Sequence, residues 1–309
     1  MKNRKVFCAL FIVLLVASSA FAALPSRRVQ EVKGGILRFL GTSEEAFQKG
    51  IDDMRDVISS SPLLQYAGTD PNIADALEVI KSFKENRHVI TFFDSLTAML
   101  MALDSGKIDE ISLPIITARY IMAQDKSYRL LFTIKMPSSI SFGFRKDSEE
   151  LCNEFNEAIK AMKEDGTLKA LEDKYIGNGF YFTSDVVTFE KFEGADTIKV
   201  AVTGDLPPID IIAADGTPTG YNTAVMAEIG KRLKKNIELL SIEAGARSSA
   251  LSSGRADVIF WYRSTEAIQF PEEAGLKEIQ LNKVIVDSSE GVILSEPYYR
   301  WEAGAFLTK

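Results

Sequence analysis

The chain has 309 residues, a net charge of −7, 46% apolar residues and a single histidine, His88. The acidic balance argues against a nucleic-acid partner and against an anionic membrane surface, since both favour a basic protein. One histidine argues against a histidine-based metal site or catalytic triad, so we expect no metal and no cofactor, while the apolar content is ample for real cores.

The first 22 residues have the pattern of a secretory signal peptide. Basic residues precede an apolar run over residues 6–17, and Ala20-Phe21-Ala22 is a small-residue cleavage site. The run is about a dozen residues, whereas a membrane-spanning helix needs roughly twenty; an uncleaved anchor is the alternative. We predict a mature protein in the periplasm or outside the cell. Cleavage also removes Cys8 and leaves only Cys152, so no intrachain disulfide is expected.

The first part of the mature chain is predicted to be an α/β unit. Strands are expected at residues 36–40, 89–93 and 108–113, with a helix at 95–103. Gly41-Thr42-Ser43 opens a further helix, and the free N–H groups of a helix N-terminus favour an anion. Residues 59–88 are interpreted as an insertion or surface arm.

The middle of the chain favours one strand and two helices. Residues 140–144 form a short apolar strand, and an amphipathic helix follows it. A shorter helix carries Leu168, Leu171 and Tyr175, and an aromatic, acidic linker then runs to Gly194. The apolar face of the longer helix comprises Leu151, Phe155, Ile159 and Met162.

Beyond residue 195 the pattern is a regular βαβαβ alternation. The strands are near-continuous apolar runs, as in a parallel sheet covered on both faces, and ligands bind at the carboxyl ends of such strands. Strands are predicted at residues 198–202, 236–242 and 256–262, and helices at 222–233 and 248–251.

The two halves of the chain contain several motifs that together are specific for one protein family. One half contains VAVTGDLPPID, DGTPTGYNTAVMAEIGKRL, ALSSGRADVIF and LSEPYY, and the other contains ILRFLGTSEEAF, ALDSGKIDEI and SFGFRKD. In this combination the chain resembles the bacterial extracellular solute-binding proteins of family 3, the polar amino acid receptors of ABC transporters. The resemblance implies an α/β, two-lobed periplasmic-binding-protein type II fold, each lobe a mixed sheet flanked by helices.

The order of the two halves is the reverse of the family's order. We therefore predict a circularly permuted receptor; two degenerate receptors in tandem are the alternative. The predicted division is a signal peptide at 1–22, ligand-binding lobe 2 at 27–139, a crossover strand with terminal helices packing on lobe 1 at 140–177, a linker at 178–194 and ligand-binding lobe 1 at 195–309.

The resemblance also implies where a ligand binds. Gly41-Thr42-Ser43 and Arg263 retain the part of the family's ligand site that binds an anion. Pro114 and Thr203, in contrast, stand where many relatives have an acid. We therefore expect a small polar or anionic ligand, amino-acid-like or of another class. A structural role remains the alternative for several of these residues. Asp94-Ser95 can be a helix N-cap, Trp261 and Tyr262 can pack in the core, and Arg263 can pair with Glu266. The candidate contacts are Gly41, Thr42, Ser43, Asp94, Ser95, Thr203, Asp205, Trp261, Tyr262 and Arg263.

The predicted function is capture of this ligand by lobe closure, with hinges near residues 140–144 and 304–308, and its presentation to an ABC-type permease by a monomer. No catalysis is needed. The alternatives are a sensor that does not transport, a degenerate interaction module, and a dehydratase- or lyase-like enzyme using Asp205, Glu243 or Asp94 as base.

Overall fold

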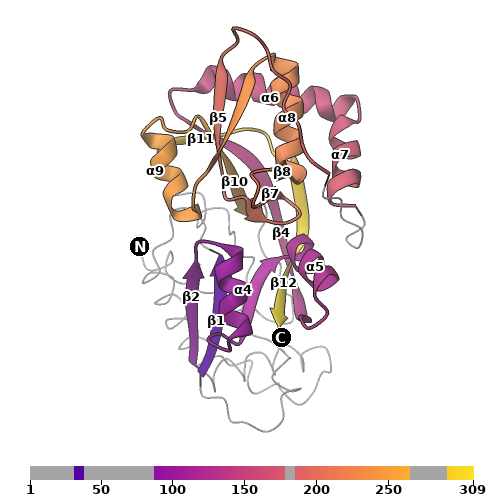
Figure 1. Cartoon of the computed structure of the whole chain (residues 1–309), viewed down its shortest axis with the longest axis vertical. Coiled ribbons are helices and arrows are strands. Elements are labelled where there is room, and N and C mark those ends of the chain that lie inside the picture. The colour runs from indigo at the N-terminus through magenta and orange to yellow at the C-terminus, as the bar shows by residue number, and fades with distance from the viewer. Residues whose placement is uncertain (1–30, 38–86, 178–184, 265–290) are drawn as a thin grey trace, which may run out of the picture.

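The computed structural model describes residues 31–37, 87–177, 185–264 and 291–309. The predicted signal peptide, the helix expected to open at Gly41 and most of the predicted arm at 59–88 lie outside these ranges. Within them, no helix is both long enough and apolar enough to span a bilayer. The elements form a lower and an upper lobe in the view of Figure 1.

The lower lobe is built on three parallel strands. β1 lies between β2 and β3 and runs parallel to both. Met99 of α4 and Ile111 of β3 are fully buried in the lobe's core. The elements are β1 (Glu31–Leu37), β2 (Arg87–Phe93), α4 (Leu96–Asp104), β3 (Glu110–Pro114) and α5 (Ile115–Gln124).

The upper lobe repeats this plan. β5 lies between β9 and β10 and is parallel to both. Its elements are β5 (Thr197–Val202), α8 (Tyr221–Leu233), β9 (Asn236–Ser241), a 3-10 turn (Ala244–Ala246), α9 (Arg247–Ser252), β10 (Val258–Ser264) and β11 (Val292–Leu294). A small antiparallel sheet consists of β6 (Asp205–Leu206), β7 (Asp210–Ile212) and β8 (Pro218–Thr219).

Two helices that follow the lower lobe in sequence pack on the upper one. They are α6 (Glu149–Glu164) and α7 (Thr167–Tyr175), and both contact α8. Three of the four residues of the apolar face predicted for the longer helix, Phe155, Ile159 and Met162, are fully buried, and Leu151 is half-buried. Phe155 packs edge-on against Phe142, with ring centroids 5.1 Å apart.

Two long strands join the lobes. β4 (Arg129–Arg145) and β12 (Tyr299–Thr308) are antiparallel to each other and run from one lobe into the other (Figure 1). β12 pairs with β3 below, whereas β4 pairs with β10 and β11 above. Among the described strands, nine therefore form one continuous sheet.

The ranges expected to contain the hinges are paired with strands of the individual lobes. Residues 140–144 pair with β10, and residues 304–307 pair with β3, so each range lies inside a lobe. The chain passes between the lobes at residues 135–137 and 301–303, where the pairing of β4 with β12 shifts register between Trp301 and Ala303. An irregularity of this kind interrupts a ladder locally and suits a point of bending.

The two lobes share a strand order and a turn. The order is β2-β1-β3-β12-β4 in the lower lobe and β9-β5-β10-β4-β11 in the upper one. In each lobe the aspartate of an A-L-x-x-G-x-x-D segment closes a loop onto the first strand. Asp109 accepts from the Lys33 amide at 2.7 Å, and Asp257 accepts from the Lys199 amide at 3.0 Å. Both aspartates are therefore structural.

Candidate functional site

The lobes meet where the N-terminus of α4 faces the strand end after β5. Asp205 of the upper lobe accepts hydrogen bonds from the amides of Leu96 (2.8 Å) and Thr97 (3.4 Å) in the lower lobe. Ser95 is the N-cap of the same helix, and its Oγ accepts from the Ala98 amide at 3.1 Å. The first N–H groups of a helix lack partners within the helix, so these two side chains supply the missing acceptors.

A second carboxyl group lies behind this contact. Asp210 is 2% exposed, and the Thr203 hydroxyl donates to it at 3.1 Å. Burial raises the pKa of Asp210 to about 6, although attraction to Arg247 and the Thr203 hydrogen bond oppose the shift. A buried carboxyl that titrates close to neutrality is typical of a functional site, and it can also be structural.

Arg247, at the start of α9, is the cation of this cluster. Its Nη1 donates to the Phe260 carbonyl at 3.4 Å, and its Nε is buried without a hydrogen-bond partner among the described residues. Burial lowers the pKa of Arg247, and the charges of Asp210 and Asp205 counteract this. Burial likewise raises the pKa of Asp205, while its bonds to α4 and the attraction of Arg247 oppose the increase. The cluster thus holds two carboxyl groups and one incompletely bonded guanidinium.

The structure brings together three of the predicted contacts. Thr203, Asp205 and Ser95 all belong to the cluster, and half-buried Asp94 directly precedes Ser95. Ser95 is the N-cap of α4, as the structural alternative for Asp94-Ser95 predicted.

For the other predicted contacts, the structure does not describe the side chains. The backbones of Trp261, Tyr262 and Arg263 lie in β10, opposite residues 141, 140 and 139 of β4, but their side chains are outside the described part of the structure. Gly41, Thr42 and Ser43 lie outside the described residues altogether.

Sequence reasoning missed two members of the cluster. Asp210 is the last residue of the P-P-I-D turn. Because it lies several residues beyond the strand end, its position in the sequence does not mark it as a site residue. Arg247 lies on a short helix whose start has no side-chain cap, so it could be read as a surface residue. The attraction between Asp210 and Arg247 arises only when the chain is folded, and no local sequence pattern predicts it.

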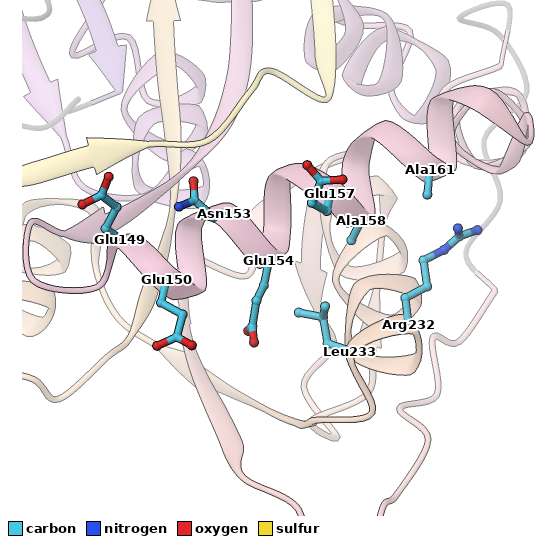
Figure 2. Close-up of a pocket in the computed structure, with 9 residues that line it drawn as sticks. All are labelled: Glu149, Glu150, Asn153, Glu154, Glu157, Ala158, Ala161, Arg232 and Leu233. Carbon is cyan, nitrogen blue, oxygen red and sulfur yellow. The ribbon is translucent and has the colours of Figure 1, made fainter.

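A separate open groove lies between α6 and α8, at the upper end of the molecule in Figure 1. Lys235 pairs with Glu154 at 2.5 Å, and Arg232 pairs with Glu228 at 3.0 Å, so the cations beside the groove are already engaged. None of the predicted ligand contacts lines it. Figure 2 shows its lining residues, which are Glu149, Glu150, Asn153, Glu154, Glu157, Ala158, Ala161, Arg232 and Leu233.

Fold and cluster together define a two-lobed α/β protein with a polar junction between its lobes. The sequence matches the bacterial extracellular solute-binding proteins, family 3, over residues 61–178 and 198–266. This is more than half of the chain, and the protein belongs to that family. Members of the family bind solutes outside the cytoplasm.

A curated relative is the L-cystine-binding protein TcyA of Bacillus subtilis (strain 168). It is 42% identical over 53 residues, which cover 17% of this chain and 20% of that protein. The matched stretch is therefore about a fifth of the relative's length.

Solved structures give more distant likenesses. Tv2483 bound to L-arginine has 11% identity and a TM-score of 0.41, covering 95% of this chain and 83% of that one. A ligand-binding component of an ABC-type import system from Staphylococcus aureus, with zinc bound, has 11% identity and a TM-score of 0.41, covering 90% and 66%. The alkanesulfonate-binding protein SsuA from Xanthomonas axonopodis pv. citri, bound to MOPS, has 9% identity and a TM-score of 0.39, covering 92% and 67%.

Proposed function

We propose that this protein captures a small polar or anionic solute between its lobes and presents it, closed, to an ABC-type permease. The observation that carries the proposal is Arg247, a guanidinium whose buried Nε lacks a partner among the described residues at the junction of the lobes. A guanidinium binds a carboxylate or a phosphate by paired hydrogen bonds, so an acidic group of the solute suits this position. Asp210 and Asp205, which share the cluster, can accept hydrogen bonds from the donors of the same solute.

In this proposal the chain is exported by residues 1–22 and acts as a monomer. Residues 27–139 form lobe 2 and residues 195–309 form lobe 1, joined by the crossover segment at 140–177 and the linker at 178–194. Closure uses bending of β4 and β12 where they pass between the lobes. The cystine-binding relative supports including amino acids among the first solutes to test.

The test is a thermal-shift screen of residues 23–309 against L-cystine, other amino acids, peptides, amines, organic acids, sulfonates and sugars. A ligand that binds only the folded state stabilises it by about 2.7 kcal/mol at a hundred times its Kd. We expect a shift that grows with solute concentration.

A matched pair of variants assigns the shift to the cluster. Arg247→Gln should abolish it, whereas Arg255→Gln, at an exposed arginine on the same lobe, should leave it unchanged. No shift with any compound contradicts the proposal, and turnover of a compound that does shift would indicate an enzyme instead. A shift that survives Arg247→Gln removes this residue from the site.

A further inference from the structure

We propose that Asp205 is a latch that joins the two lobes in the absence of any solute. The contact is an upper-lobe carboxylate bound to two lower-lobe amides, those of Leu96 and Thr97. The inference rests on the proposed function only in that lobe closure is the motion the latch restrains.

The N-terminus of α4 binds a carboxylate from the other lobe. The N-terminal end of a helix carries a partial positive charge, which an acid in the first turn commonly balances. The first turn of α4 contains no acidic residue, and its own cap, Ser95, is engaged with the Ala98 amide. Asp205, which is 108 residues away in sequence from Thr97, places a carboxylate on the free amides of this turn. The helix end and the carboxylate complement each other across the junction.

The upper lobe holds Asp205 in a fixed position. Asp205 pairs with Ile211 in the small sheet, and the Ile212 amide donates to the Gly204 carbonyl at 2.7 Å. Gly204 has a φ of +74°, and a Cβ there would lie 3.0 Å from Ile212 Cγ1, so a side chain is disfavoured at this position. The carboxylate therefore belongs to a rigid hairpin, and it does not follow α4 when the lobes separate.

Opening the lobes exchanges this contact for water. Burial disfavours the charged form of Asp205, and the two α4 amides counteract this penalty. On opening, both the carboxylate and the helix N-terminus become hydrated, so the latch biases the equilibrium toward closure without locking it. The latch thus gives the closed form a contact that the open form lacks, and a solute enters through the open form.

The latch is tested without solute, on residues 23–309 carrying Cys152→Ser and two spin labels. The labels replace exposed Met101 on α4 and exposed Arg255 on the upper lobe. In the parent protein we expect one narrow distance distribution. In Asp205→Ala we expect the distribution to broaden toward distances longer by about 5 Å or more, as for a domain opening. Amide hydrogen exchange at Leu96 and Thr97 should become at least about fivefold faster.

Two further variants make the outcome decisive. Asp215→Ala removes an exposed upper-lobe aspartate that bonds only within its own turn in the described structure, to the Thr217 amide, and should change neither measurement. Asp205→Asn keeps an acceptor but loses the charge, and should give intermediate values; it decides the case if Asp205→Ala loses its near-UV circular dichroism. Unchanged distances and exchange in Asp205→Ala would overturn the latch, as would an already open parent protein. Because no solute is present, a failed solute screen leaves this result standing.

Discussion

At the scale of single residues, Asp210 makes stability depend on pH. Its pKa is about 6 in the folded protein, against an ordinary value of 3.8, so between these values the folded chain binds a proton that the unfolded chain has released. Stability therefore falls as pH rises through this window, by up to about 3 kcal/mol for a shift of about two pKa units. Asp210→Asn should flatten the decline, measured by urea unfolding between pH 4 and pH 7. Asp215→Asn, at an exposed position, is the control and should keep the full decline.

Tyr298 and Asn222 form a buried pair that ties the P-Y-Y motif to the G-Y-N motif. The Tyr298 hydroxyl donates to Asn222 Oδ1 at 2.9 Å, and Asn222 is 2% exposed. Tyr298→Phe leaves this oxygen buried without its donor, which costs about 1–3 kcal/mol. Chemical denaturation checks the loss. A double-mutant cycle with Asn222→Ala should show coupling between the two positions, and strictly additive losses would refute the pairing.

At the scale of elements, the entry into α8 depends on a close backbone approach. Gly220 has a φ of +106°, and a Cβ there would lie 2.6 Å from the Ile209 carbonyl oxygen. The amides of Tyr221 and Asn222 donate to the carbonyl oxygens of Pro208 and Ile209, respectively, across the same turn. Gly220→Ala should therefore cost about 2 kcal/mol or more, since the clash adds to backbone strain.

A second glycine isolates the two contributions to this loss. Gly216 also has a positive φ, +84°, but an added Cβ meets nothing within 4 Å. Gly216→Ala should carry only the backbone cost, about 1 kcal/mol. Thermal unfolding of the two variants gives the comparison, and equal losses would show that the contact with Ile209 contributes nothing.

Elements with strong periodicity could be predicted from the sequence, and those without it could not. The apolar spacing located α6 and α8 to within a few residues. The helix α5 was missed because its N-cap, Pro114, offers no side-chain cap and Ile115-Ile116 extends the apolar run of β3. The 17-residue strand β4 was predicted as five residues, since the stretch with Pro137 and Ser138 has no strand pattern. In the site, Asp205 could be predicted because it follows a strand end. Its bonds to the Leu96 and Thr97 amides could not, since these amides belong to the other lobe.

At the scale of the whole molecule, two matched half-sheets share the crossing strands β4 and β12. The lobes are thus joined by these two crossing strands and by contacts across the junction such as Asp205 to α4. Neither half is complete without the other, because β12 of the C-terminal part lies between β3 and β4 in the lower lobe. Two independent halves in tandem would not share strands in this way, whereas the predicted circular permutation, which stays a prediction, is compatible with it.

The predicted circular permutation leads to an experiment on the chain's connectivity. The Thr308 hydroxyl donates to the Asp109 carbonyl at 2.9 Å, and the Asp109 amide donates to the Lys33 carbonyl at 2.7 Å, so the end of β12 and the start of β1 flank the same residue. A variant that joins residue 309 to residue 27 and begins at residue 185 should keep the fold, because it preserves every pairing of the described strands. Circular dichroism, the melting temperature and the solute profile should match those of the parent protein. If the halves are instead separate units, residues 195–309 produced alone should unfold cooperatively, and the rejoined chain should gain no stability over them.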